Sequence, residues 1–392
     1  MPLRLTTAGE SHGPRLTAIL EGIPAGLTVD PDFLASELAR RQHGYGRGGR
    51  MKIEHDVAIL EGGLRGGRTL GSPIAIGIAN ADFANWKGVM DPLSIDPDAA
   101  AARRLTRPRP GHADLAGGMK YGARDLRDVL ERASARESAA RVAAGAVCKL
   151  LLGACGIRVA SGVLSIGAVA DARSARSFAA LAAVREESPL RAVDAALEPA
   201  MVAAVDAAKG RGETLGGSVL VAAHGVPAGL GAYASWDRRL DARIGQALLS
   251  VPSVKAVELG ASIEASRGPG SLAHDEIERG PDGTLRRRTN RAGGLEAGVT
   301  NGEDVVAVAY FKPISTLARG LDSVDLETGE TARSAYERSD VTAVPAGGVI
   351  AEAMLAFVLA DAVLEVTGGD RLEDVVARLA AHRERVRRYP SP

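Results

Sequence analysis

The stretch that decides the fold, residues 107–149, reads RPRPGHADLAGGMKYGARDLRDVLERASARESAARVAAGAVCK. Its second half predicts a helix, because Ser134 followed by Glu137 matches a capping box and an Ala- and Val-rich run without Pro continues to about Leu152. A helix of this composition can be buried between other layers of the protein. We therefore expect it to lie at the centre of the fold.

The first half of the same stretch predicts a binding site for an anion. Two prolines stiffen the loop 107–112, which presents arginines and His112. The start of the following helix adds free backbone N–H groups and the positive end of the helix dipole, an arrangement that suits phosphate. The alternative is a buried helix preceded by solvated arginines. Seven arginines are expected around His112: Arg107, Arg109, Arg124, Arg127, Arg132, Arg136 and Arg141.

Length and composition limit the class of protein. The chain has 392 residues, with 48 Lys and Arg balanced by 48 Asp and Glu, and only 3% aromatic residues. Zero net charge argues against nucleic-acid and membrane-surface binding, and the few aromatics argue against a stacking platform. Cys148 and Cys155 lie on one helical face, too far apart for a disulfide, which fits a reducing compartment. With no apolar signal segment, the chain is expected to be soluble and cytoplasmic.

The pattern of apolar residues predicts a mixture of helices and strands. Strands are expected at 3–7, 16–23, 57–60, 74–78, 218–223 and 305–311, and helices at 30–41, 236–249, 348–366 and 371–389. No Rossmann or P-loop motif occurs at the required strand-to-helix junction. These patterns favour an α+β layered β-α-β sandwich, in which long helices lie between antiparallel sheets.

An internal echo indicates duplication. Residues 22–27 read GIPAGL and residues 225–230 read GVPAGL, an offset of 203 residues (225 − 22), and each is followed by a predicted helix. Chance similarity in a Gly- and Ala-rich chain is the alternative. We expect one domain over residues 1–392, built from pseudo-twofold halves at 1–155 and 156–366 with a helical tail at 367–392.

Other sequence features favour or exclude particular kinds of binding site. Residues 41–50 form a glycine-rich loop with three arginines, and Lys312, Ser315 and Thr316 follow a strand end as a second phosphate grip, suited to a cofactor. The seven histidines form no metal-binding spacing, so no metal site is expected. A hydrolase acting through Ser11 and His12 and a non-enzymatic phospholigand-binding protein remain alternatives to an enzyme that releases phosphate.

Seven ordered motifs together resemble the chorismate synthase family. They are GESHG at 9–13, ARRQHGYGR at 39–47, RPGHAD at 109–114, ERASARESAARVAAGA at 131–146, SVPSVKAVELG at 250–260, KPIST at 312–316 and RSDVTAVP at 338–345. The resemblance implies a lyase that converts 5-enolpyruvylshikimate 3-phosphate to chorismate and phosphate by trans 1,4-elimination. This is the last step of the shikimate pathway, which feeds aromatic amino acid biosynthesis, and it requires reduced FMN although no net redox change occurs.

The resemblance also implies roles for individual residues. His12 matches the family histidine beside the substrate phosphate, the candidate proton donor, and His112 matches the one that protonates reduced flavin near N1. Ser11 and Asp340 match the pair that relays a proton around flavin N5. Substrate binding would fall to Arg41, Arg47, Arg109, Arg136 and Arg338, of which Arg41 and Arg47 also match NADPH positions. FMN contacts would come from Arg132, Ala133, Ser134, Pro252, Ser253, Ala297, Lys312, Pro313, Ile314, Ser315, Thr316 and Arg338.

The same resemblance implies an assembly and a source of electrons. The family fold is a β-α-β sandwich with internal pseudo-symmetry, and the expected assembly is a homotetramer. Because no reductase domain is visible in the sequence, we expect an external flavin reductase to supply reduced FMN, with NADPH as a possible reductant. No nucleic acid or membrane partner is expected.

Overall fold

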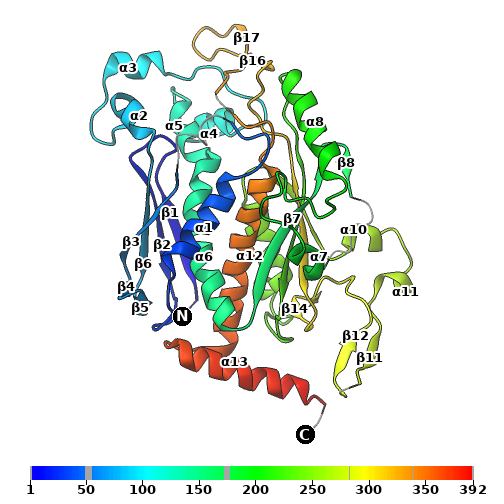
Figure 1. The fold of residues 1–392 in the computed structure, drawn as a ribbon. Helices are drawn as coiled ribbons and strands as arrows, with labels where there is room; N and C mark the ends of the chain where they lie inside the picture. Colours follow the sequence, from blue (N-terminus) through cyan, green and yellow to red (C-terminus); the bar gives the residue numbers. More distant parts are fainter. Residues whose placement is uncertain (1, 49–54, 172–176, 282, 338, 391–392) are drawn as a thin grey trace.

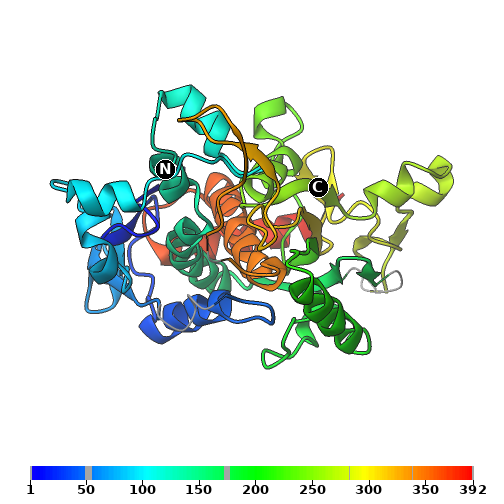
Figure 2. The same ribbon diagram turned by 90° about the horizontal axis from the view of Figure 1, so that it is seen from above.

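Two antiparallel sheets and two long helices make up the centre of the molecule in the computed structural model (Figure 1). The structure describes residues 2–48, 55–171, 177–281, 283–337 and 339–390. Its mixture of helices and antiparallel sheets agrees with the predicted α+β class. Viewed from above, the two helices lie in the middle of the molecule with sheet strands on either side (Figure 2).

The first sheet covers one side of the helices. Its strands, in spatial order, are β1 (Arg4–Ala8), β2 (Arg15–Glu21), β6 (Ile74–Ala79) and β3 (Ala58–Gly62). Along β2 the side chains alternate between buried and half-buried, and Leu16, Ala18 and Leu20 are the buried set. Since alternate side chains of a strand point to opposite faces, this sheet places one apolar face on the core.

The second sheet is more deeply buried. Its spatial order is β10 (Val254–Leu259), β15 (Val305–Phe311), β9 (Gly217–His224), β7 (Arg158–Ile166) and β8 (Val169–Ala170). One face packs on the helices, and the other is covered near Phe178 and Leu181 of α7 (Phe178–Ala182). Burial on both faces explains why β9 and β15 are almost continuously apolar instead of alternating.

The central helices are α6 (Ser138–Ala154) and α12 (Val344–Thr367). Helix α6 packs against β2 and β6, α12 packs against β7 and β9, and the two helices pack against each other. Small residues permit the close approach: a Cβ added at Gly145 of α6 would lie 2.4 Å from Cβ of Ala353. Both helices run with their N-terminal ends toward the upper end of Figure 1.

Shorter elements flank this centre. Helix α1 (Pro31–Gln42) packs on α6 and α12, α9 (Leu240–Leu249) packs on α12 and β10, and α13 (Leu372–Arg387) follows α12 at the lower end of Figure 1. At the upper end lie α2 (Phe83–Met90), α3 (Pro97–Ala102), α4 (Asp114–Tyr121), α5 (Arg127–Ala133) and the hairpin β16 (Asp322–Val324) and β17 (Thr331–Arg333). The remaining elements are β4 (Leu64–Arg65), β5 (Arg68–Thr69), α8 (Glu198–Gly210), α10 (Ser262–Ala265), α11 (Gly270–Ala273), β11 (Ile277–Arg279), β12 (Leu285–Arg287), β13 (Leu295–Glu296) and β14 (Val299–Thr300).

The two halves of the chain contain matching turns. In the first half the backbone N–H of Leu27 donates to Thr69 Oγ1 at 2.9 Å, and in the second half that of Leu230 donates to Thr300 Oγ1 at 2.8 Å. The two donors are 203 residues apart (230 − 27), the offset of the sequence echo. In each half the threonine ends a two-stranded hairpin, β4–β5 or β13–β14.

The starts of three helices differ from the sequence prediction by more than one residue. Glu137 does not complete a capping box, because its carboxylate contacts Thr7 and Arg141 while Ser134 Oγ accepts from Arg136 N, so a 3₁₀ turn (Ala135–Glu137) precedes α6. The predicted helix 236–249 is split at Arg239 into a 3₁₀ turn and α9. Helix α12 begins four residues earlier than predicted, with Pro345 in its first turn.

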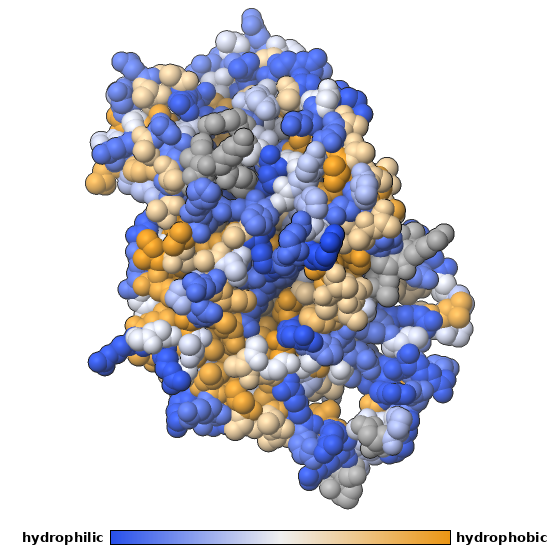
Figure 3. Space-filling model, viewed as in Figure 1, coloured by the Kyte–Doolittle hydropathy of each residue, from blue (hydrophilic) through white to orange (hydrophobic). Residues whose placement is uncertain are grey.

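Surface polarity varies along the molecule. On the face seen in Figure 3, hydrophilic side chains predominate at the upper end, and apolar side chains gather lower down, over the helical layer. Among the described residues, no helix combines the length and the apolar character that crossing a membrane would require.

Candidate active site

A cavity of about 410 Å³ opens where the N-terminal ends of α6 and α12 meet the upper loops. Ala135, Arg136 and Ser138 bring the start of α6 to it, and Ala343, Ala346 and Gly347 bring the start of α12. The positive ends of two helix dipoles therefore face the same space. Of the residues predicted from sequence, the cavity is lined by Ser11, His12, Arg41, Arg47, Arg109, His112, Ala133, Ser134, Arg136, Pro252, Ser253, Lys312, Ile314, Ser315, Thr316 and Asp340.

Arg41 and Arg136 form a buried pair around one carboxylate. Arg136 contacts Asp56 at 2.5 Å, and Arg41 contacts the other oxygen of Asp56 at 3.3 Å. Nε of Arg136 also donates to Asn80 at 2.9 Å, and Nε of Arg41 donates to Ser138 at 3.0 Å. Burial, opposed by Asp56 but reinforced by the nearby charges of Arg136 and Arg47, lowers the pKa of Arg41 to about 10. Two guanidinium groups sharing one carboxylate leave positive charge available to an anion.

His12 is held on one edge and on one face. Its Nδ1 lies 2.8 Å from Glu131 Oε1, and its backbone N–H donates to Glu131 Oε2 at 2.7 Å. The imidazole stacks on Trp86 with ring centroids 4.0 Å apart and planes inclined by 23°. Burial raises the pKa of Glu131, but contacts with His12 and the charge of Arg127 outweigh it and hold that pKa below its ordinary value. The ionised carboxylate is thus available to the imidazole.

His112 has a carboxylate partner of its own. Its Nδ1 lies 2.5 Å from Asp114 Oδ1, and Arg109 grips the same carboxylate through its backbone N–H and its guanidinium. Although burial raises the pKa of Asp114, hydrogen bonds from His112 and Arg109 hold it well below the ordinary value. Arg109 also donates to Thr316 Oγ1 at 2.9 Å, which ties the RPGHAD loop to the KPIST loop.

Ser11 and Asp340 enter the cavity from different loops. The Ser134 hydroxyl donates to Ser11 Oγ at 3.1 Å. Asp340 accepts from Gly48 N at 2.6 Å and pairs with Arg47 at 3.0 Å. Asp340 therefore holds the glycine-rich loop against the start of α12, and Arg47 reaches the cavity through this contact.

The remaining wall fits the phosphate and ring of a flavin nucleotide. Lys312 donates to Gly111 O at 2.5 Å and to Ser315 Oγ at 2.8 Å, and burial together with Lys255 lowers the pKa of Lys312. Close by, Phe311 and Ile350 supply apolar surface. Ser253, in the loop after α9, lines the cavity and has a left-handed φ of 72°. A cation and hydroxyls next to apolar side chains are the donor set that such a ligand needs.

Several predicted site residues lie elsewhere. Arg132 is exposed and donates to the carbonyls of Thr7 and Gly9, and Pro313 is exposed between two lining residues. Ala297 lies at the tip of the β13–β14 hairpin with a left-handed φ of 50°, because that two-residue turn requires such a backbone. None of these three lines the cavity. Arg338 lies outside the described residues.

The expected ring of seven arginines around His112 is wrong. Arg109 contacts His112 directly and Arg136 lines the same cavity, whereas Arg107, Arg124 and Arg132 are exposed. Arg127 pairs with Glu131 and Glu337, and Arg141 pairs with Glu137 and donates to Ser250. Arginines that are close in sequence point to different faces of a helix. The many arginines of this stretch therefore do not form a cluster around His112.

Sequence reasoning also missed residues that organise the site. These are the carboxylates Asp56, Asp114 and Glu131, the amide Asn80 and the ring of Trp86. Asp114 and Glu131 lie inside the quoted RPGHAD and ERASARES motifs. They could have been predicted from the sequence, because a buried cation requires a counter-charge. Among the described residues, no group of three or more His, Cys, Asp or Glu side chains could hold a metal ion.

Comparisons with known proteins agree over nearly the whole chain. The family model of chorismate synthase matches residues 3–364. The chorismate synthase of Moorella thermoacetica (strain ATCC 39073 / JCM 9320) is 54% identical over 382 residues, covering 97% of this chain and 98% of its own. That of Geobacillus kaustophilus (strain HTA426) is 52% identical over 388 residues, covering 99% of both chains.

A solved structure extends the comparison to three dimensions. A crystal structure of chorismate synthase matches this one with a TM-score of 0.80 at 40% sequence identity, and the match covers 99% of both chains. Sequence and structure thus point to one family, whose motifs line the cavity described above. The chain therefore belongs to the chorismate synthase family of enzymes.

Proposed function

We propose that the cavity at the ends of α6 and α12 converts 5-enolpyruvylshikimate 3-phosphate to chorismate and phosphate, by a trans 1,4-elimination that requires reduced FMN. This is the last step of the shikimate pathway, and it agrees with the family to which the chain belongs. The single observation that carries the proposal is the convergence of two imidazoles, His12 and His112, with four arginines in one space.

Substrate binding is the role of the arginines. The substrate carries a phosphate and two carboxylates, so it requires several fixed positive charges. Arg41 and Arg136 both pair with Asp56, and Arg47 and Arg109 line the same cavity. Guanidinium groups match the planar geometry of carboxylate and phosphate oxygens, and the helix ends add backbone donors. An anion here would compete with Asp56 and Asp340 for groups that are already oriented.

Acid chemistry is the role of His12. Its Nδ1 edge is occupied by Glu131, so its Nε2 is the atom available to a ligand in the cavity. An imidazolium there would donate its Nε2 proton to the departing phosphate oxygen, as expected of a general acid near neutral pH. Stacking on Trp86 restricts rotation of the ring out of this orientation.

The residues proposed to contact FMN are chosen for the charged, hydroxyl and apolar groups with which they line the cavity. Lys312, Ser315 and Thr316 would hold the phosphate end of FMN, Ala133, Ser134, Pro252, Ser253 and Ile314 would contact the rest, and His112 would protonate the flavin near N1. Bound in its reduced form, FMN would supply electron density to the substrate and a site for the proton that the substrate loses. Ser11 and Asp340, which line the cavity from two different loops, would hold and move that proton.

The fold, the assembly and the reductant belong to the same proposal. Sheets packed on both sides of α6 and α12, and matching turns at Thr69 and Thr300, support a β-α-β sandwich with pseudo-twofold duplication in one domain of halves 1–155 and 156–366. We further propose a cytoplasmic homotetramer supplied with reduced FMN by an external reductase. Arg41 and Arg47 would serve NADPH only if the chain reduced its own flavin.

Anaerobic phosphate release tests the proposal. With 5-enolpyruvylshikimate 3-phosphate, FMN and dithionite, the wild-type chain should release phosphate and form chorismate, and His112→Ala should reduce turnover about 10-fold or more. Release without flavin would instead favour a hydrolase using Ser11 and His12. Aerobic turnover driven by NADPH with the purified chain alone would contradict the external reductase.

A further inference from the structure

A buried carboxylate, Glu131, occupies the Nδ1 edge of His12, and its effect on the protonation of the imidazole goes beyond the function proposed so far. Glu131 lies on α5 with a fully buried side chain, and His12 lies in the loop after β1, 119 residues away along the chain. Three contacts join them: Nδ1 of His12 lies 2.8 Å from Oε1 and 3.0 Å from Oε2 of Glu131, and the His12 backbone N–H donates to Oε2 at 2.7 Å. Both the ring and the main chain of His12 are therefore fixed to one side chain.

Neighbouring groups hold Glu131 in place. Its other charged contact is Arg127 at 3.3 Å, on the same helix, and Arg127 in turn pairs with Glu337 at 2.8 Å. The Ser11 backbone N–H donates to the Glu131 carbonyl at 2.9 Å, so the GESHG loop is attached to α5 by the main chain as well. Arg127 and Arg103 lie over the Trp86 ring at 5.0 and 4.3 Å, and Trp86 stacks on His12.

This geometry decides which ring nitrogen carries the proton. An ionised carboxylate only accepts hydrogen bonds, so the nitrogen facing it must carry hydrogen. In neutral His12 the proton therefore lies on Nδ1, and Nε2 has a lone pair directed away from Glu131. In the imidazolium, Nε2–H is the donor that remains, and loss of that proton to a phosphate oxygen leaves Nδ1–H bonded to Glu131 unchanged.

We propose that Glu131 is the positioning residue for His12, fixing its orientation and its Nδ1–H tautomer so that Nε2 exchanges the proton with the ligand. This inference rests on the proposed function, in which His12 is the acid. The role is separate from that of Asp114 at His112: Asp114 also holds Arg109 through three groups, whereas Glu131 contacts none of the arginines that line the cavity among its described contacts.

Spectroscopy tests the inference without flavin or substrate. In ¹⁵N-histidine-labelled protein, the two ring nitrogens of His12 distinguish the tautomers by their chemical shifts. Wild type should show the Nδ1–H form, and Glu131→Gln should show a mixture, because an amide can either accept or donate at Nδ1. Asp128→Asn, on the same helix and exposed, is the matched control and should leave the spectrum unchanged. A wild-type His12 spectrum in Glu131→Gln would overturn the proposal.

Kinetics supply the second test. Glu131→Gln should lower kcat about 10- to 100-fold with little change in KM, as found when a residue that orients a catalytic group is removed. Glu131→Asp, which keeps the charge on a shorter stem, should recover part of the loss. In a His12→Gln background, Glu131→Gln should cost less than about twofold, since it acts through the imidazole. An equal loss with and without His12 would mean a structural role.

Two controls distinguish the role of Glu131 from a loss of folding and from a failure of the proposed function. Arg127 keeps Glu337 as a partner in Glu131→Gln, so that variant should unfold cooperatively, and thermal unfolding checks this. Should it fail to fold, the wild-type spectrum alone decides the proposal, because an Nε2–H tautomer of His12 in the folded wild type would overturn it. If the wild-type chain releases no phosphate with reduced FMN, the proposed function is wrong, while the tautomer measurement still decides whether Glu131 sets the proton on His12.

Discussion

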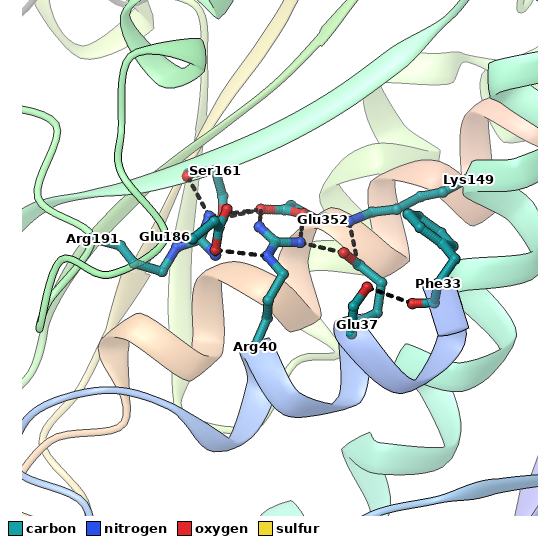
Figure 4. A network of polar contacts seen from close by, with 9 residues as sticks. Phe33, Glu37, Arg40, Lys149, Ser161, Glu186, Arg191 and Glu352 are labelled. Carbon is teal, nitrogen blue, oxygen red and sulfur yellow. Dashed lines mark hydrogen bonds and ion pairs between the residues drawn. The ribbon is translucent and has the colours of Figure 1, made fainter. Parts of the chain in front are cut away.

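Arg40 and Arg41 are consecutive residues of α1, yet their side chains enter two different buried ionic clusters. The Glu352 cluster, defined as Glu37, Arg40, Lys149, Ser161, Glu186, Arg191 and Glu352, lies between α1, α12 and β7 (Figure 4). The cavity cluster consists of Arg41, Asp56, Asn80, Arg136 and Ser138. Successive helical residues point about 100° apart, so one turn of α1 serves both.

The two clusters differ in charge balance. The Glu352 cluster contains three carboxylates and three cations. Arg40 by itself contacts all three carboxylates: Glu37 at 2.5 Å, Glu186 at 3.0 Å and Glu352 at 2.9 Å. Burial lowers the pKa of Arg40, but these carboxylates outweigh it and raise that pKa overall. In the cavity cluster two arginines share Asp56, and the pKa of Arg41 falls to about 10.

This difference supports a structural role for the Glu352 cluster and the binding role proposed for the cavity cluster. Glu352 is fully buried in α12, and although burial raises its pKa, Lys149, Arg40 and Arg191 hold that pKa well below the ordinary range. Every charge there already has a counter-charge, so a ligand would gain little by entering. Around Arg41 two guanidinium groups pair with one carboxylate, Asp56, an arrangement that would favour a phosphate or carboxylate as a further partner.

The largest expected effect is on stability. Glu352→Gln removes the charge that Arg40, Lys149 and Arg191 share, and we expect it to lower the free energy of unfolding by about 3–5 kcal/mol. Urea unfolding measures this. Glu186→Gln is the matched control: Glu186 belongs to the same cluster but is 54% exposed, so its loss should cost about 0–1 kcal/mol. Equal losses in the two variants would remove the distinction between the buried and exposed members.

The second prediction sets the neighbouring arginines against each other. Arg41→Met should weaken binding of the phosphorylated substrate by about 1.5–3 kcal/mol, the scale of a charged hydrogen bond, with a smaller effect on unfolding. Arg40→Met should do the reverse, lowering stability and leaving affinity within about twofold. Isothermal titration calorimetry and urea unfolding of both variants give the comparison. If Arg40→Met weakened substrate binding as much as Arg41→Met, both clusters would belong to the binding site.

Local sequence predicted most elements because their signals are local. Asp30 and Pro31 predicted the start of α1, and the Ala-rich run predicted α6 to within a turn. The arginines of the cavity were found through the family motifs. Nothing local separates Arg40 from Arg41 inside the ARRQHGYGR motif, since the two differ only in which side of α1 they occupy.

Long-range partners could not be read from the sequence. Glu352 was passed over inside the apolar run of α12, and its partner Arg40 is 312 residues away. A lone carboxylate in an apolar helix is a usable signal, because such a charge requires a counter-charge when buried. The signal shows that a partner exists, whereas the partner's identity depends on how the sheets bring α1 against α12. For the same reason the sequence did not predict the role of Asp56, whose partner Arg136 is 80 residues away along the chain.

Acid pH should weaken the Glu352 cluster, whereas neutral pH should leave it intact. The pKa of Glu352 is lower in the folded chain than its usual 4.5, so its stabilising contribution is complete above that value and is lost as pH falls through the folded pKa. The free energy of unfolding should decrease below about pH 5, with Glu352 contributing a slope on the order of 1 kcal/mol per pH unit down to its folded pKa. In Glu352→Gln the slope should be smaller. An unchanged slope would assign the acid sensitivity to other carboxylates.

The smallest effect is expected at an exposed ion pair, which tests whether burial is what distinguishes the clusters. On the β16–β17 hairpin, Arg333 contacts Asp322 at 2.9 Å with side chains 67% and 83% exposed. The distance equals that of the Arg40–Glu352 contact, also 2.9 Å, but water solvates both groups before and after unfolding. Asp322→Asn should therefore shift Tm by less than about 1 °C in differential scanning calorimetry. A shift as large as that of Glu352→Gln would mean that contact distance, and not desolvation, determines what an ion pair contributes in this fold.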